Sequence, residues 1–313
     1  MTRHPHTGPE RPTSDALGSE PDTPPRALSA GSHREARTDG GAASTVRVGT
    51  YNVRYAGIDE GQFAWEQRRD AVVTAIRRTD ADVMALQEVW LEQLPDLRDR
   101  LNYEWIAHPD ASGPHTPLAY EPTRFTVVDE GTFGLAPGGE RGVVAWDAHF
   151  QRLVTHATLR DRQTDRTFTV FSVHFDHEGT TARRESARLL TDRLPGGPCV
   201  VAGDYNCESG SEPYRRLAEP LIDTAQRAAD RQGPRSTYVG FGRSDEDAAA
   251  ANRDDPDGRG GADQDDVGPS SPMDRRRLDH VFARGFDVRR HRVCVPDGLA
   301  SDHRPVVTDL VME

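Results

Sequence analysis

Residues 299–311 read LASDHRPVVTDLV, so an acid and an imidazole, Asp302 and His303, stand directly before an apolar run. The run at 304–311 predicts a strand, because β-branched and apolar residues dominate it. A strand that only had to fold would need neither a carboxylate nor an imidazole at its start. The ends of the other predicted strands are therefore where partners of Asp302 and His303 should be sought.

The composition sets broad limits. A chain of 313 residues is long enough for one large α/β domain or two smaller ones. It has no lysine, all 39 basic residues are arginine, and the formal net charge is -12. Such an acidic balance fits either a halophilic protein or a GC-rich genome that avoids lysine codons, and it does not indicate nucleic-acid binding.

The three cysteines, Cys199, Cys207 and Cys294, are odd in number and lack CxxC spacing, which argues against a disulfide framework. No stretch approaches the roughly 18 apolar residues of a membrane helix. The first residues lack the apolar centre of a signal peptide. We therefore expect a soluble, cytoplasmic, monomeric protein without a membrane span.

Two segments carry almost no large apolar side chains and cannot bury enough surface to offset the entropy of ordering. Residues 1–44 are predicted to be a disordered N-terminal tail. Residues 243–274 are predicted to be a disordered acidic insertion within a single domain that spans residues 45–313.

Apolar periodicity between these segments alternates between strand and helix. Helices are expected at 63–80, 92–101 and 181–194. Strands are expected at 45–53, 81–89, 125–133, 152–161, 167–175, 199–206, 276–283, 291–297 and 304–311. This order favours an α/β fold in which two mainly antiparallel sheets pack face to face, with helices outside.

Polar side chains recur where these strands end or begin. They are Asn52, Gln87, Glu88, His174, Asp176, His177, Asp204, Asn206, Asp279, His280, Asp302 and His303. Strand ends at one rim of a sheet can converge although they are remote in sequence, so we expect a site there.

The residue types indicate the chemistry. Glu88, Asp204 and Asp302 offer hard carboxylate oxygens, and Asn52 and Asn206 offer neutral ones, which suits Mg²⁺ or Mn²⁺. Mg²⁺ usually takes only one or two carboxylates, which leaves others free for acid–base work. Histidines beside such an ion can stabilise a developing phosphorane or protonate a leaving oxygen. The set points to metal-assisted hydrolysis of a phosphate ester.

Each residue also has a purely structural interpretation. Glu88 could be a solvated cap, the GDYN segment a turn, His174 a core imidazole, and Asp279 an ion-pair partner of a neighbouring arginine. Asp302 and His303 could cap a strand. His177, His280 and His291 are interpreted mainly as structural. The recurrence of metal-ligand chemistry at strand ends favours function for the rest.

The segments TYNVRY, LQEV, VHFDH, AGDYN, RLDHVF and SDHRPV occur in this order. As an ordered set they resemble the endonuclease/exonuclease/phosphatase superfamily, in particular its subgroup of bacterial and archaeal metal-dependent hydrolases. The resemblance covers residues 45–313 apart from the insertion. It implies a DNase I-like, four-layer α/β sandwich with the site at one edge.

The resemblance also implies roles. Glu88 would be the principal Mg²⁺ ligand, and Asn52 and Asp302 would help to hold the metal or its waters. Asp204 would orient or deprotonate the attacking water, and Asn206 would bind the scissile phosphate.

The remaining implied roles concern the phosphate and the leaving group. His303 would contact the phosphate and be steered by Asp279. His174 would assist the phosphate or the leaving group. In this subgroup a helix with paired arginines follows HFDH, and Arg183 at that position is expected to bind substrate.

Two positions depart from the subgroup. Gly134 stands where it usually has a tryptophan, and residues 112–125 lack its usual Gly-Glu pair. Both border the expected pocket, so the resemblance does not imply a particular substrate. We expect a Mg²⁺-dependent phosphodiesterase or phosphomonoesterase that acts on a small molecule or a lipid head group. The alternatives are a DNA or RNA nuclease and, less favoured, a non-catalytic binding module.

Overall fold

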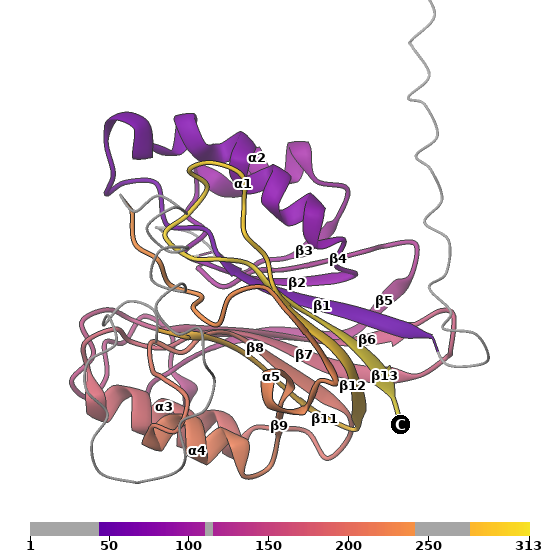
Figure 1. The fold of residues 1–313 in the computed structure, drawn as a ribbon. Helices are drawn as coiled ribbons and strands as arrows, with labels where there is room; N and C mark the ends of the chain where they lie inside the picture. Colours follow the sequence, from indigo (N-terminus) through magenta and orange to yellow (C-terminus); the bar gives the residue numbers. More distant parts are fainter. Residues whose placement is uncertain (1–43, 110–114, 242–275) are drawn as a thin grey trace, which may run out of the picture. The chain divides into compact units, whose positions relative to one another are not determined.

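The computed structural model describes residues 44–109, 115–241 and 276–313. In this part of the chain two β-sheets face each other and helices cover their outer sides (Figure 1). The α/β sandwich predicted from the sequence is therefore confirmed. The predicted tail, apart from Ser44, and the whole predicted insertion lie outside the described residues. Among the described helices none is long and apolar enough to cross a membrane.

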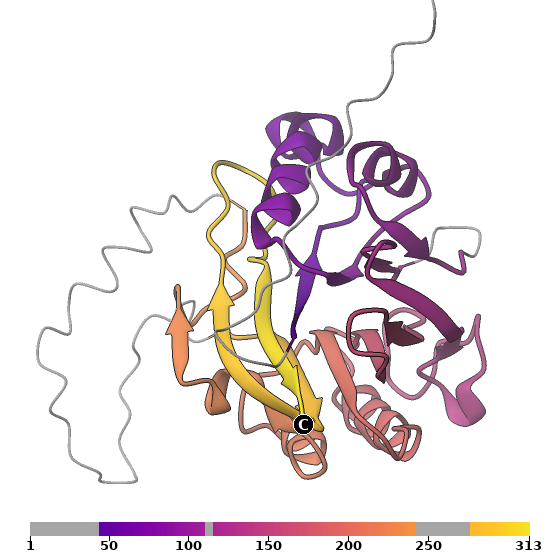
Figure 2. The same cartoon turned by 90° about the vertical axis from the view of Figure 1, so that its right-hand side faces the viewer.

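The first sheet has β1 near its centre, with β13 antiparallel on one side and β2 parallel on the other. In Figure 2 the yellow strands β12 and β13 lie side by side, and the indigo β1 lies next to β13. In spatial order the strands are β10 (Asp230–Gln232), β12 (Phe286–Val293), β13 (Val306–Met312), β1 (Thr45–Asn52), β2 (Val83–Gln87), β4 (Leu118–Tyr120) and β3 (Glu104–Ile106).

The second sheet pairs β7 with β8 in parallel, and all its other described pairs are antiparallel. Together with the first sheet this confirms two mixed, mainly antiparallel sheets. In spatial order the strands are β5 (Phe125–Gly134), β6 (Leu153–Asp161), β7 (Thr167–His174), β8 (Cys199–Asp204), β11 (Asp279–Arg284) and β9 (Ile222–Asp223).

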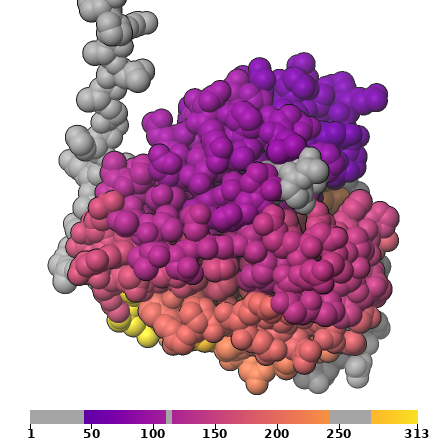
Figure 3. All heavy atoms as spheres, turned by 180° about the vertical axis from the view of Figure 1, so that it is seen from behind, coloured from indigo at the N-terminus to yellow at the C-terminus, as the bar shows by residue number. Residues whose placement is uncertain are grey.

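Helices α1 (Trp65–Thr79) and α2 (Gln93–Arg100) cover the first sheet. Helices α3 (Thr180–Asp192) and α4 (Glu212–Ala218) cover the second. The same order is seen from behind, where the indigo and purple N-terminal elements lie above the orange ones (Figure 3). The short helix α5 (Thr224–Arg227) contacts β11 and β12.

Several elements escaped the sequence prediction. Helix α4 and the two- and three-residue strands β3, β4, β9 and β10 are too short to show a period. Strand β12 begins at Phe286, five residues before the predicted start at 291, because Arg289 and Arg290 interrupt its apolar pattern. The register with β13 shifts between Val288 and Arg290, which marks an irregularity at that point.

Strict alternation along the central strands directs one face of each sheet into the core between the sheets. In β1, Val46 and Val48 lie in this core, and the same alternation places Asn52 on the same face. In β8, Val200 and Ala202 are followed in the same way by Asp204. Burying one such valine contributes about 1.5–3 kcal/mol. The packing of these core residues therefore fixes the positions of Asn52 and Asp204 at the strand ends.

Candidate active site

Strand register brings three of the predicted residues of the second sheet together. Strands β7 and β8 are parallel, and His174 is paired with Asp204. Strands β8 and β11 are antiparallel, and Asp279 is paired with the same Asp204. Asp204 therefore lies between a histidine and a second carboxylate at the end of β8. It is only 1% exposed.

The first sheet delivers its residues to the same place. Strands β1 and β2 pair Asn52 with Gln87, so Glu88 follows at the strand end. The two sheets are joined just below, where Gln87 Nε2 lies 3.3 Å from Ser172 Oγ of β7. This contact fixes the strand ends of both sheets at one edge.

Asn52 links two of the carboxylates. Its Nδ2 donates to Glu88 Oε1 at 2.9 Å and to Asp204 Oδ2 at 3.0 Å. Its Oδ1 accepts the backbone N–H of Arg54 at 3.0 Å. In this arrangement the amide nitrogen, not the oxygen, faces the carboxylates, so Asn52 positions two acids close together.

Asp302 is buried and paired with Arg54, whose Nη1 lies 3.2 Å from Asp302 Oδ2. Arg54 also binds Asp59 at 3.0 Å. Burial raises the pKa of the Asp302 carboxyl, while His303 and Arg54 act in the opposite direction. Asp302 and the half-buried Glu88 thus lie near the same arginine, Arg54.

His303 and Asp279 form a hydrogen-bonded pair in which His303 Nδ1 and Asp279 Oδ2 are 2.8 Å apart. The other nitrogen, Nε2, lies 3.7 Å from Asp204 Oδ2. Burial disfavours the imidazolium, but Asp279 and Asp204 outweigh it and hold the pKa of His303 well above its usual range. Burial raises the pKa of Asp204, and His303 opposes this. The protonated His303 ring, paired with Asp279 on one side, therefore faces the buried Asp204 on the other.

His174 has the opposite character. Its Nε2 lies 3.2 Å from Asn206 Nδ2, 3.6 Å from Asp204 and 4.0 Å from Glu88. Burial lowers its pKa well below the usual range, and the Arg152 guanidinium lowers it further. The site therefore contains one neutral and one protonated imidazole.

Arg152 belongs to the site, although no role was predicted for it. Its Nε lies 3.2 Å from Asp176, its Nη1 3.2 Å from the ring nitrogens of His174, and its Nη2 2.9 Å from His177 Nδ1. It directly precedes β6, whose antiparallel register on β7 places it beside the end of that strand. That hairpin register is the one signal by which it could have been found.

The predicted role of Arg183 is not supported by its position. Its Nη1 donates to the backbone carbonyl of Asp176 at 2.9 Å, and it does not line the cleft. The Asp176 side chain accepts the N–H groups of Glu178 and Gly179 at 3.0 and 2.8 Å. Arg183 and Asp176 therefore shape the loop after β7, and a contact of Arg183 with substrate stays a prediction from the sequence.

Three site residues have left-handed backbone conformations that glycine would adopt more easily. They are Arg54 (φ 58°), Glu88 (φ 60°) and Asn206 (φ 47°). Such a conformation costs roughly 1–2 kcal/mol for a residue with a Cβ. Its occurrence at polar residues, each held by hydrogen bonds, is typical of functional sites.

These residues open into a cleft of about 930 Å³. Among the residues that line it are Arg54, Tyr55, Ile58, Glu88, Trp90, His115, Thr116, Val144, His149, Phe150, Arg152, His174, His177, Asp204, Asn206, Tyr238, Asp302 and His303. Asn52 and Asp279 support lining residues from behind. The predicted residues, Arg183 excepted, thus form one connected group.

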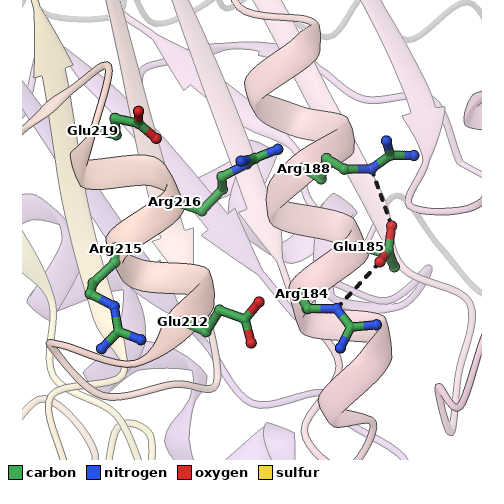
Figure 4. A pocket seen from close by; sticks show the side chains of 7 residues that line it. All are labelled: Arg184, Glu185, Arg188, Glu212, Arg215, Arg216 and Glu219. Carbon is green, nitrogen blue, oxygen red and sulfur yellow. Dashed lines mark hydrogen bonds and ion pairs between the residues drawn. The ribbon is translucent and has the colours of Figure 1, made fainter.

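A second hollow of about 350 Å³ lies between α3 and α4, on the outer side of the second sheet (Figure 4). Four arginines and three glutamates line it, and Arg184 and Arg188 both bind Glu185. No histidine is among these lining residues, and their charges are nearly balanced. It lacks the buried acids and imidazoles that distinguish the cleft.

The residues of the cleft fit a divalent cation. Glu88 and Asp302 offer hard oxygens near each other, and Asp279 Oδ1 is buried without a hydrogen-bond partner. Ligand atoms of Asp204, Asp279 and His303 also lie within 4.8 Å of one another. In this group of three, His303 and Asp279 are already hydrogen-bonded to each other. The oxygens of Glu88 and Asp302 therefore offer a better site for a hard cation.

The sequence pattern of the Endonuclease/Exonuclease/phosphatase family matches residues 49–303, which include every strand end described above. The chain belongs to this family. Members of this family are phosphoric ester hydrolases, so the chain is a phosphoric ester hydrolase, and its two-sheet α/β fold is the fold of the family.

Solved structures of other proteins have a similar fold. An endonuclease/exonuclease/phosphatase from Bacteroides vulgatus is 28% identical, with a TM-score of 0.72, over 86% of this chain and 100% of its own. The mannosyl-6-phosphatase Bt3783 of Bacteroides thetaiotaomicron VPI-5482 is 23% identical, with a TM-score of 0.69, over 85% and 100%. D. rerio TDP2 in complex with a single-strand DNA product is 15% identical, with a TM-score of 0.61, over 85% and 99%. The last two likenesses concern the fold alone.

Proposed function

We propose that this family member is a Mg²⁺- or Mn²⁺-dependent phosphoesterase that hydrolyses its ester by in-line attack of water. The observation that carries the proposal is the position of Asp204, a buried acid within 3.7 Å of both His174 and His303. An acid between a neutral and a protonated imidazole can take a proton from water while the charged ring stabilises anionic oxygens.

Glu88 and Asp302 would hold the cation, and Asn52 would keep Glu88 and Asp204 in place. When bound, the divalent ion neutralises charge on the phosphate oxygens. Arg54 holds Asp302 at 3.2 Å, so the carboxylate is already oriented.

The other residues have separate tasks. Asp204 orients the attacking water and accepts its proton. Asn206 donates its amide N–H to a phosphate oxygen, and His303, held by Asp279 at 2.8 Å, places positive charge there. His174, kept neutral by burial and Arg152, assists the phosphate or the leaving oxygen. We propose a small phosphomonoester or phosphodiester, or a lipid head group, as the substrate.

The experiment compares wild type with Asp204→Ala and His303→Ala on a panel of chromogenic monoesters and diesters and on plasmid DNA, with Mg²⁺, Mn²⁺ or chelator. Each variant should lose about 10²–10³ in kcat. His108→Ala, outside the cleft, is the matched control and should keep its activity. Full activity of His303→Ala would refute the assignment, and plasmid nicking without ester turnover would favour a nuclease.

A further inference from the structure

The walls of the cleft differ in character from its floor. The floor is polar and holds Asp204, Asn206 and the two imidazoles. The walls carry large apolar side chains that are unusually exposed: Ile58 is 45%, Val144 55% and Phe150 50% exposed. Apolar surface concentrated around one cleft indicates a ligand with an apolar part.

One wall is a flat, fixed aromatic surface. Tyr55 and Trp90 stack with ring centroids 4.8 Å apart and an interplanar angle of 17°. The buried Gln93 connects the backbone segments that carry the two rings. Its Oε1 accepts the backbone N–H of Trp90 at 3.0 Å, and its Nε2 donates to the backbone carbonyl of Arg54 at 2.9 Å. Because the loops are held by a core residue, this surface is in place before a ligand binds.

A second part of the cleft lining also presents a flat ring. Phe150 lies nearly parallel to His177, at 22° and 5.9 Å, and meets His149 edge-on at 4.3 Å. The Arg152 guanidinium lies 5.8 Å from the Phe150 ring. The same arginine contacts His174 on the floor at 3.2 Å, so this wall adjoins the phosphate end of the cleft.

A phosphate alone would leave most of the cleft empty, because about 930 Å³ is within the range of drug-sized ligands. A planar ring would stack on either surface. Charge and shape therefore select for a phosphate at the floor and an aromatic group at the walls.

We propose that the cleft selects phosphate esters whose alcohol carries a flat aromatic group, which packs against Trp90 and Phe150. This rests on the proposed function, because it takes the floor of the cleft as the phosphate site. The aromatic group could belong to a simple aryl ester or to a nucleoside, which present the same flat apolar face.

Binding of unreactive ligands tests this without interference from leaving-group reactivity. Calorimetry with Mg²⁺ would compare inorganic phosphate, propylphosphonate and naphthylmethylphosphonate on wild type, Trp90→Ala and Phe150→Ala. Wild type should prefer the naphthyl ligand over the propyl ligand by about 10-fold, as expected for aromatic stacking. Each variant should lose most of that preference and bind inorganic phosphate as wild type does.

Leu91→Ala is the matched control, because Leu91 is 45% exposed and adjacent to Trp90 but does not line the cleft. It should keep the full preference. If Trp90→Ala fails to fold, Phe150→Ala still decides, since the Phe150 side chain is half exposed. Tighter binding of adenosine 5′-monophosphate than of the naphthyl ligand would support the proposal and assign the ring to a nucleobase. Weaker binding, with the preference intact, would support it and assign the ring to an aryl ester.

Equal affinities for the naphthyl and propyl ligands would overturn the proposal, as would a preference that survives both wall substitutions. Binding to phosphatidylcholine vesicles through Phe150 without a preference for the naphthyl ligand would also overturn it, in favour of a lipid surface. Failure of the proposed function looks different, because inorganic phosphate would then not bind and His303→Ala would not change turnover.

Discussion

Asp204 has four polar neighbours. It accepts hydrogen bonds from the Asn52 amide at 3.0 Å and the Asn206 backbone N–H at 2.9 Å, and the rings of His174 and His303 lie 3.6 and 3.7 Å away. Few side chains could replace a buried acid with so many partners. The polar ends of the strands could be recognised from sequence because alternation assigns them to the same face as the core valines.

Arg152 and Arg183 show where reasoning from single residues fails. Both are arginines near predicted strand or helix starts, and nothing local distinguishes their environments. Only the register of β6 on β7 puts Arg152 at the cleft, while the Arg183 guanidinium is taken by the Asp176 carbonyl. Long side chains have too many rotamers for their sequence position to fix their partners.

Replacing Arg152 tests its place in the site. Arg152→Ala removes its contacts to Asp176, His174 and His177, and we expect kcat to fall by about 10²-fold, as for loss of one electrostatic contact. Arg152→Lys should recover only part of this, because lysine cannot reach several partners in a planar fork. Steady-state kinetics measures both variants. Arg160→Ala is the control, because the exposed Arg160 guanidinium pairs with Asp165 in the described part of the chain. It should behave as wild type, and a loss of kcat equal to that of Arg152→Ala would refute the assignment.

At the scale of elements, the parallel pair β7–β8 holds the geometry of the site. A Cβ on Gly203 would lie 2.0 Å from the Val173 backbone carbonyl, so only glycine allows these strands their present spacing. Gly203→Ala should push β8 away from β7 and separate Asp204 from His174. We expect a loss of about 1–3 kcal/mol in the free energy of unfolding, as for overpacking, together with a large fall in kcat.

Urea unfolding and kinetics together measure this effect. Gly196→Ala is the matched control, because a Cβ there has no atom within 4 Å and its φ is not positive. It should leave both quantities nearly unchanged. Wild-type behaviour of Gly203→Ala would mean that the strand spacing does not set the site.

Elements were predictable in proportion to their length. The long amphipathic helices and the hairpin β6–β7 follow from their periods, but three-residue strands such as β3 and β10 have none. The departure at Gly134 also has a local cause, since a Cβ there would lie 1.8 Å from the Glu140 carbonyl. That close approach shapes the loop leading to the cleft wall, and it depends on a contact that sequence alone does not reveal.

Over the whole molecule, acid stability should reflect two histidines buried behind the site. His280 contacts Arg277, and its Nε2 lies 3.0 Å from the Cys207 carbonyl; His291 lies 2.9 Å from Thr224 Oγ1. Burial, with a contribution from Arg277, lowers the pKa of each to about 4, and Asp223 acts in the opposite direction. Both are therefore neutral when folded at neutral pH.

The sign of the pH dependence follows from these values. Between pH 6.5 and 4 the unfolded chain binds protons at these histidines and the folded chain does not, so folding stability is complete above pH 6.5 and falls on acidification. Each histidine contributes a slope of about 1.4 kcal/mol per pH unit across that window. Urea unfolding of wild type and His291→Gln from pH 7.5 to 4.5 should give a smaller slope for the variant by up to that amount. His149→Gln, whose side chain is 49% exposed, should keep the wild-type slope, and equal slopes for His291→Gln and wild type would show that burial of His291 is not linked to folding.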